Sequence, residues 1–129
     1  MPFPVDQKWI DEAETRLGVK LPKSYREAMA PLNGGEIEAM GDVWEMYPVW
    51  DKSDKKRLTR TCNDIVRETG TSRSCDGFPQ NAVAIATNGC GDQLILLPNE
   101  NDSSRLDETV FFWSHETREI EPVLEKVKR

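Results

Sequence analysis

The feature that most constrains this chain is a change in its hydrophobic spacing after the Asn-Gly-Gly at residues 33–35. Before that point, apolar residues recur every three or four positions, as on one face of a helix. These residues are Trp9, Ile10, Ala13 and Leu17, then Tyr25, Ala28, Met29 and Leu32. After it, the apolar residues alternate with polar ones or form short β-branched and aromatic runs, which is typical of strands. Helices followed by a run of antiparallel strands predict an α+β fold.

The spacing also predicts where the elements lie. We expect two N-terminal helices packed on a twisted antiparallel sheet, with a further helix near residues 55–69 closed by Gly70 and a loop at 71–80. The expected helices span 6–17 and 22–33, and the clearest expected strands span 83–86, 93–97 and 109–113. Shorter strands are expected around Ile37, at 43–47 and at 120–123. A chain of 129 residues, 1–129, has the length of a single domain.

Large side chains and glycines give two more specific expectations. The residues expected to be largely buried are Trp9, Leu17, Tyr25 and Trp113, whereas Trp44 and Trp50 are expected to be more exposed. The segment 88–92 reads as a glycine-bearing hairpin connection. Gly89 or Gly91 should therefore have a positive φ, which other residues resist.

The cysteines and the N-terminus favour a cytoplasmic protein. Cys62, Cys75 and Cys90 are odd in number and form no CxxC pair, so they predict reduced, partly buried thiols and neither a disulfide framework nor a zinc site. Residues 1–8 show no signal-peptide pattern. No apolar run approaches the ~20 residues that a membrane-spanning helix needs, so we expect no membrane association.

The net charge of −6 is unevenly distributed. Residues 1–50 hold nine acids and five bases, and residues 76–129 hold ten acids and five bases. Residues 51–75 hold four acids and seven bases, mostly in a stretch from Lys52 to Arg60 that is typical of a solvated helix start or loop. Because an acidic domain repels phosphate backbones, direct binding of nucleic acid is disfavoured.

No constellation in the sequence predicts catalysis, a metal or a cofactor. The glycines near Asn88 lack the Lys and Ser or Thr of a phosphate-binding loop, and Asp92 follows them instead. The single histidine, His115, precedes Glu116 in an expected turn after a strand. A small enzyme built around Asp92 and His115 is the less favoured alternative.

Several motifs recur in the order expected for one known family. The opening carries Trp9-Ile10, Ala13-Glu14, Leu17-Gly18-Val19, Leu21-Pro22 and Tyr25, and ends in Leu32-Asn33-Gly34-Gly35. Later segments are Ala84-Ile85-Ala86, Gly91-Asp92-Gln93-Leu94 and Val110-Phe111 with Trp113 and His115-Glu116. This arrangement resembles the SUKH superfamily, which includes fungal Smi/Knr cell-wall-assembly regulators and bacterial toxin-immunity proteins. Two departures are that residues 51–80 match no family motif and that the C-terminal helix of many relatives is not evident.

The resemblance implies a non-catalytic, protein-binding role. The favoured interpretation is an immunity protein that neutralises a cognate toxin, such as a nuclease, by direct binding. A regulatory adaptor for a housekeeping partner is the alternative. Acidity suits a basic partner, and aromatic side chains are common interface anchors. The residues expected to bind the partner are Glu36, Glu38, Asp42, Trp44 and Trp50.

Overall fold

The computed structural model describes residues 2–125 and 127–129, which form four helices and six strands. The helices are α1 (Gln7–Leu17), α2 (Lys23–Met29), α3 (Lys55–Arg60) and α4 (Ile65–Arg73). The strands are β1 (Gly35–Ala39), β2 (Asp42–Met46), β3 (Val83–Thr87), β4 (Gln93–Pro98), β5 (Leu106–Trp113) and β6 (Ile120–Pro122). The α+β class and the N-terminal helix pair are confirmed.

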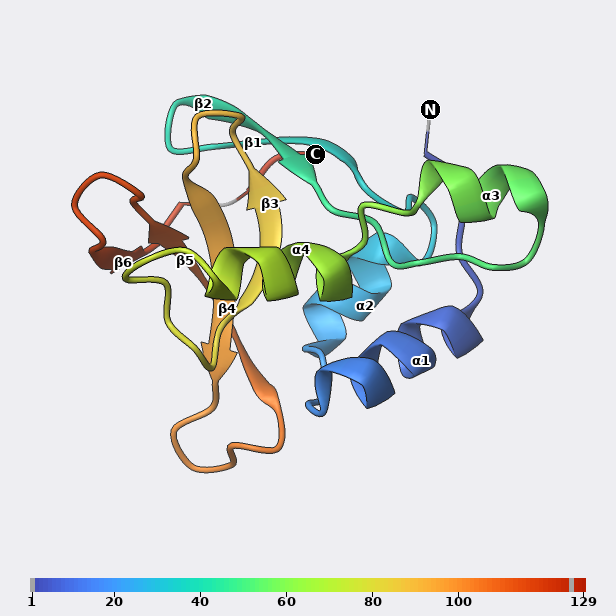
Figure 1. Cartoon of the computed structure of the whole chain (residues 1–129), viewed down its shortest axis with the longest axis horizontal. Helices are drawn as coiled ribbons and strands as arrows, with labels where there is room; N and C mark the ends of the chain where they lie inside the picture. Colours follow the sequence, from blue (N-terminus) through green and yellow to red (C-terminus); the bar gives the residue numbers. More distant parts are fainter. Residues whose placement is uncertain (1, 126) are drawn as a thin grey trace.

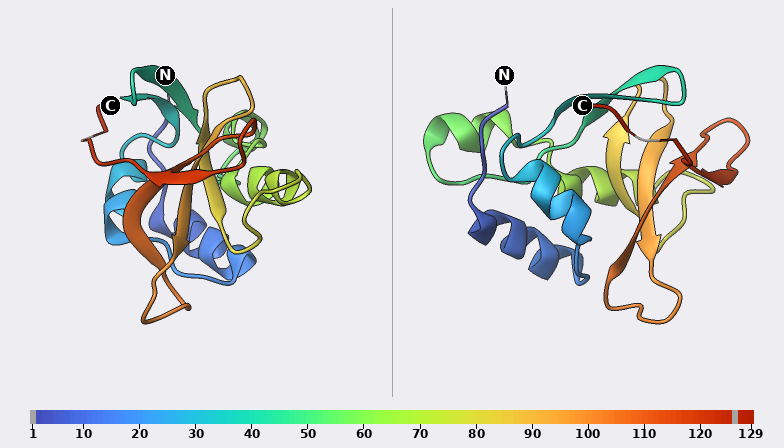
Figure 2. Two further views of the ribbon diagram at one scale, coloured as in Figure 1. Left: turned by 90° about the vertical axis from the view of Figure 1, so that its left-hand side faces the viewer. Right: turned by 180° about the vertical axis from the view of Figure 1, so that it is seen from behind.

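The six strands make one sheet in which each strand pairs antiparallel with the next along the chain. Figure 1 shows α4 crossing one face of this sheet, where it packs on β3. Helix α1 packs against α4, and α2 contacts β5. The C-terminal segment returns to β1, where Lys128 pairs with Glu38 by two backbone hydrogen bonds of 2.7 and 3.1 Å (Figure 2).

A buried carboxylate, Glu14, joins the two N-terminal helices. It is 8% exposed and its Oε2 accepts a hydrogen bond of 2.7 Å from the backbone N–H of Leu21 in the link between the helices. Its Oε1 lies 3.0 Å from the Arg26 guanidinium of α2. A buried charge is tolerated when it is paired and hydrogen-bonded, and these contacts link α1 both to the connection after it and to α2.

Two helix bounds differ from the expectation. The helix expected near 55–69 is two helices, because the Asp64 side chain accepts from the N–H groups of Val66 and Arg67 and starts a new helix there. Gly70 lies inside α4, and the loop expected at 71–80 begins only after Arg73. Helix α2 ends at Met29 and not at residue 33, since Pro31 cannot donate the next helical hydrogen bond.

The burial of the large side chains is partly as expected. Tyr25 and Trp113 are buried, whereas Trp9 and Leu17 are half-buried and pack at the edge of the core. The expected exposure of Trp44 is wrong, because this side chain is 1% exposed. Trp44 lies opposite Ile37 across the β1–β2 pair, and both face the core.

The glycine turn at 88–92 is confirmed. Gly89 has a φ of 82° and Gly91 a φ of 102°. A Cβ atom on Gly91 would also lie 3.0 Å from the His115 ring, so this position needs glycine for space as well as for backbone conformation.

The three cysteines are free thiols, but the expectation that they are partly buried is wrong, since all three are exposed. They lie outside the helices and strands, in segments whose side chains face solvent at these positions. Among the described helices, none has the length and apolar character needed to cross a membrane.

Candidate protein-binding surface

The β1–β2 hairpin carries an outward face of acidic side chains around one apolar residue. We call Glu36, Glu38, Val43 and Glu45 the acidic hairpin; all four are exposed. Asp42 is also exposed, but it pairs with Ala39 at the end of the hairpin and so lies on the same side as Trp44. Side chains alternate between the faces of a strand, so the residues between these four point inward. These inward residues, Ile37, Ala39, Trp44 and Met46, belong to the core. The hairpin therefore has one face anchored in the core and one face available for contact.

The register of the hairpin places like charges opposite each other. Glu36 pairs directly with Glu45. The backbone N–H and C=O of Glu38 are both hydrogen-bonded to Lys128, on the side of β1 away from β2. Glu38 therefore makes no backbone hydrogen bond to its partner on β2, and because the two types of pair alternate along an antiparallel ladder, neither does Glu36 to Glu45. In such a non-hydrogen-bonded pair the two side chains lie closer together. Like charges in such a pair are destabilising. Beside them, Val43 is 49% exposed, which gives the acidic face an apolar centre.

The structure brings together only two of the five residues expected to bind a partner. Glu36 and Glu38 share the acidic hairpin, whereas Asp42 lies at the end of the hairpin on the other side. Trp44 faces the core, and its indole N–H donates to the Ala39 carbonyl at 3.0 Å. Trp44 is therefore not an exposed contact. Trp50 is half-buried and stacks with Arg16 of α1 and with Lys52, at 5.1 and 5.2 Å.

Sequence reasoning missed Val43 and Glu45 as members of this surface. The signal was present in the alternation of residues 43–46, in which Trp44 and Met46 occupy one face and Val43 and Glu45 the other. Assigning the two large apolar residues to the core would have placed Val43 and Glu45 together on the outward face.

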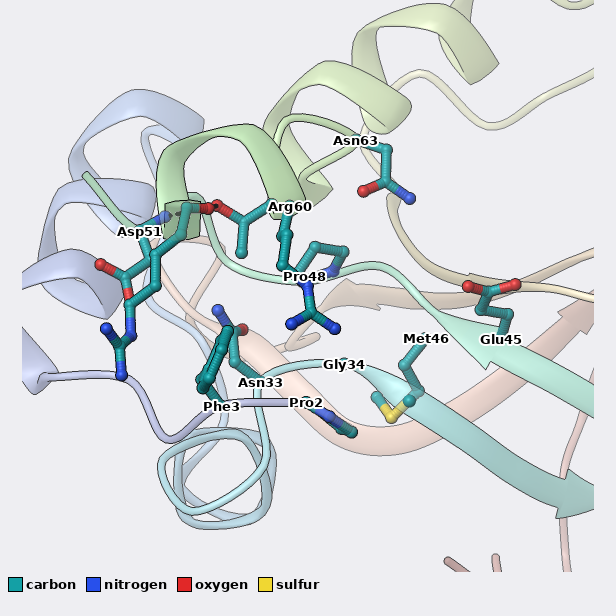
Figure 3. Close-up of a pocket in the computed structure, with 13 residues that line it drawn as sticks. Pro2, Phe3, Asn33, Gly34, Glu45, Met46, Pro48, Asp51, Arg60 and Asn63 are labelled. Atoms are coloured by element: carbon teal, nitrogen blue, oxygen red, sulfur yellow. Dashed lines mark hydrogen bonds and ion pairs between the residues drawn. The ribbon is translucent and has the colours of Figure 1, made fainter. Parts of the chain in front are cut away.

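A polar pocket of about 230 Å³ separates the acidic hairpin from α3. Figure 3 shows Arg60 and Phe3 pointing toward each other across it, with Glu45 on the far side. The Phe3 ring lies within cation–π distance of three α3 side chains, at 5.5 Å from Lys56, 4.3 Å from Arg57 and 4.8 Å from Arg60. The basic stretch expected at 52–60 is thus a mostly exposed helix start that also holds the N-terminal segment in place.

Hydrogen bonds link three turns at one end of the sheet. The Asn88 side-chain amide donates to Asp42 at 3.2 Å and to Asp92 at 3.1 Å. Asp92 Oδ1 in turn accepts from the backbone N–H of His115 at 3.0 Å and lies 2.7 Å from His115 Nδ1. These contacts tie the end of the β1–β2 hairpin to the β3–β4 and β5–β6 turns.

The turn contacts change the acidity of Asp92. Burial opposes its ionisation, but hydrogen bonds from the His115 side chain, the His115 backbone and the Asn88 amide outweigh burial and hold the pKa of this carboxyl below its ordinary value. A carboxyl with a depressed pKa in the folded state stabilises the fold above its unfolded pKa, and this contribution is lost as the pH falls through the folded pKa.

We expect Asp92→Asn to lower the free energy of unfolding at pH 7 by about 1 kcal/mol, because it removes a charged acceptor of hydrogen bonds. The difference between the native chain and the variant should shrink as the pH falls below about 4, where the unfolded carboxyl takes up a proton, and should vanish once the pH is below the lowered pKa of the folded carboxyl. Urea unfolding at pH 7 and at pH 3 measures both values. A difference that stays constant over this range would contradict the assigned role of the Asp92 charge.

The contacts of the Asp92–His115 pair hold two turns together. Both a backbone N–H and a ring nitrogen of His115 bind the same carboxylate oxygen, which orients the residue that follows β5. Within residues 2–125 and 127–129, no group of three or more His, Cys, Asp and Glu side chains is placed to hold a metal ion.

Comparison with models of known families shows to which family the chain belongs. The model of the "SMI1 / KNR4 family (SUKH-1)" matches residues 4–128. The chain belongs to the SMI1/KNR4 (SUKH-1) family. Neither a curated protein sequence nor a solved structure matches it. The match extends through residues 51–80, so α3 and α4 are part of this SUKH-1 domain, although their sequence carried no family motif that we could identify.

Membership of the SUKH-1 family is consistent with a binding or immunity protein. The sequence resemblance to SUKH domains is thereby confirmed over nearly the whole chain. The C-terminal helix of many relatives, which is not evident in this sequence, has no counterpart among residues 123–125 and 127–129, where the chain instead pairs with β1 at Lys128.

Proposed function

We propose that this SUKH-1 protein is a non-catalytic immunity protein, which neutralises a cognate toxin by placing its acidic hairpin against a basic surface of that toxin. The observation that carries the proposal is the direct pairing of Glu36 with Glu45. A like-charge pair costs stability in the free protein. A cationic partner would relieve this repulsion on binding, so the same residues that weaken the free hairpin would strengthen the complex.

The chemistry of the hairpin fits a toxin that acts on nucleic acid. A nuclease surface must be basic to hold phosphates, and a patch of opposite charge speeds the encounter and sets its orientation. Val43 adds exposed apolar area at the centre of the patch, where interfaces are less charged than at their rim. Trp50 does not belong to the acidic hairpin, because its ring lies against the Arg16 guanidinium of α1, and it is proposed as a separate contact with the partner.

Two other functions compete with this proposal. A regulatory adaptor would use the same surface for a housekeeping partner, and a gene for a large toxin beside this one would favour immunity over it. A small enzyme would need Asp92 and His115 for turnover, whereas both groups already serve the contacts between turns. The free thiols favour the cytoplasm, where thiols stay reduced.

The test uses capture from the native cell and inhibition of the captured protein. The tagged native chain should retain a basic protein and should abolish its nuclease activity at an equimolar ratio. The triple variant Glu36→Gln, Glu38→Gln, Glu45→Gln should retain much less of it. A matched variant, Glu116→Gln, Glu119→Gln, Glu121→Gln, makes the same change in net charge at exposed sites near β6 and should behave like the native chain.

Equal loss of capture in both triple variants would show that only net charge matters and would contradict the assigned surface. A captured partner with no toxic activity would favour the adaptor. Turnover by the native chain that disappears on replacing Asp92 or His115 would replace the binding proposal with an enzyme.

A further inference from the structure

The segment that joins β2 to α4 carries basic side chains close together in the sequence. We call Lys52, Lys55, Lys56, Arg57 and Arg60 the basic face; Arg57 is half-buried and the other four are exposed. Between Lys52 and Arg60 the chain holds a single acid, which forms an ion pair with Arg57. The basic face is therefore a compact positive surface on a chain whose net charge is −6.

Aromatic rings hold these cations in place. The Lys56 ammonium and the Arg60 guanidinium lie 5.5 and 4.8 Å from the centre of the Phe3 ring. The Lys52 ammonium lies 5.2 Å from the centre of the Trp50 ring. Such contacts between cations and rings are attractive. A long side chain that is already ordered loses less conformational entropy when a partner binds, so the basic face is prepared for a contact.

The basic face lies next to the acidic hairpin. Arg57, Arg60 and Glu45 line the same polar pocket, and Figure 3 shows Arg60 and Glu45 on different sides of it. Glu36 pairs directly with Glu45 and therefore lies on the acidic side. Lys56 lies one helical turn before Arg60, so both project from the same side of α3. The surface around the pocket thus has a negative side and a positive side.

The acidic side is not neutralised within the chain. Among residues 2–125 and 127–129, neither Glu36 nor Glu45 forms an ion pair. Two adjacent patches of opposite charge are complementary to the same two patches after a rotation of 180°. In a two-fold dimer both copies use the same surface, so the negative patch of each copy can face the positive patch of the other.

We propose that a second copy of this chain binds this surface, with the acidic hairpin of each copy against the basic face of the other. The net charge of −6 opposes association, but charges more than about 8 Å apart are largely screened at physiological salt, whereas charges in contact are screened much less. Exposed ion pairs are individually weak, so we expect a reversible dimer. The dimer does not depend on the proposed toxin, although a toxin that takes the acidic hairpin would displace the second copy.

Charge reversal of each patch, followed by mixing of the two variants, tests this pairing. Glu36→Lys, Glu45→Lys makes the hairpin basic, and Lys56→Glu, Arg60→Glu makes the α3 patch acidic. Each variant alone should stay monomeric, because like charges then meet at both contacts. An equimolar mixture should form the dimer, because each contact again joins opposite charges. Dimer formation in the mixture also shows that both variants are folded, and circular dichroism checks each variant separately.

Sedimentation equilibrium measures the association. At about 0.1 M salt and protein concentrations up to about 1 mM, the mean mass of the native chain should rise from 14.7 kDa to a plateau at twice this value. A plateau is expected because a two-fold contact closes at two copies. Raising the salt to about 0.5 M should return the native chain to the monomer, since the contact is electrostatic.

Net charge alone predicts a different result. The hairpin variant brings the net charge of −6 closer to zero, so weaker overall repulsion would make it associate more than the native chain. The two-patch contact predicts that it associates less. A matched variant, Lys23→Glu, Arg105→Glu, changes the net charge as much as the α3 variant does, at exposed positions outside the basic face, and should still form the dimer.

Four results would overturn the proposal. The first is a native chain that stays monomeric over the whole concentration range. The second is a dimer that persists in either charge-reversed variant alone. The third is a mixture of the two folded variants that stays monomeric. The fourth is a native mass that continues to rise beyond that of two copies, since this would exclude a two-fold contact.

Discussion

Replacing Trp44 with alanine should lower the free energy of unfolding by about 3–5 kcal/mol, the usual cost of truncating a buried aromatic side chain. Trp44 is 1% exposed, and its ring packs edge-on against Phe112 with centroids 5.8 Å apart. Its indole N–H donates to the Ala39 carbonyl within the same hairpin. Removal of the side chain leaves a cavity beneath the acidic hairpin and takes one hydrogen bond from the Ala39 carbonyl. Chemical denaturation followed by circular dichroism measures the change.

The adjacent residue provides the matched control. Val43 lies on the opposite face of β2 and is 49% exposed, so Val43→Ala should change the stability by about 0.5 kcal/mol or less. Similar losses in the two variants would show that the assignment of inward and outward faces in β2 is wrong, and with it the composition of the acidic hairpin.

The second large effect concerns the rate of association with the partner. Neutralising Glu36, Glu38 and Glu45 should slow association about tenfold at low salt, because steering by opposite charges accounts for much of a fast encounter. The fold should be retained or slightly stabilised, since the change removes the repulsion between Glu36 and Glu45. Stopped-flow mixing with the captured partner measures the rate, and urea unfolding measures the stability.

The variant at Glu116, Glu119 and Glu121 separates local steering from total charge. It alters the net charge equally, at exposed positions beside or within the short edge strand β6. Its association rate should fall by less than about twofold, because exposed charges beyond about 8 Å from the contact are screened at physiological salt. A decrease equal to that of the hairpin variant would remove the reason for assigning the contact to β1 and β2.

The sequence predicted the elements whose spacing is regular. The helix that ends before Gly18 and the strands expected at 83–86, 93–97 and 109–113 follow from their periodicity and from the glycines between them. The structure places them in α1, β3, β4 and β5, although β5 begins earlier than expected, at Leu106. The break between α3 and α4 was harder to predict, because Leu58, Cys62, Ile65 and Val66 fit one helical face while the Asp64 cap interrupts it. A side chain that caps a helix start can override an apolar stripe in so short a segment.

The candidate surface was only partly predictable for a different reason. The high frequency of acidic residues near the hairpin was enough to propose Glu36, Glu38 and Asp42 as binding residues. The face on which Trp44 lies depends on the register with β1 and on the position of the core, which involves residues far apart in the chain. Three separate turns likewise supply the contacts among Asp42, Asn88, Asp92 and His115. No local sequence pattern predicts these contacts.

The measurement that tests the binding proposal most directly is the association rate with the captured partner as a function of salt concentration. We expect a steep fall in this rate for the native chain as salt rises from 20 to 300 mM, on the order of tenfold or more. The hairpin variant should start lower and show a much shallower slope, so that the two curves converge at high salt. Parallel curves, or a native rate that does not respond to salt, would contradict an acidic hairpin that steers a basic partner.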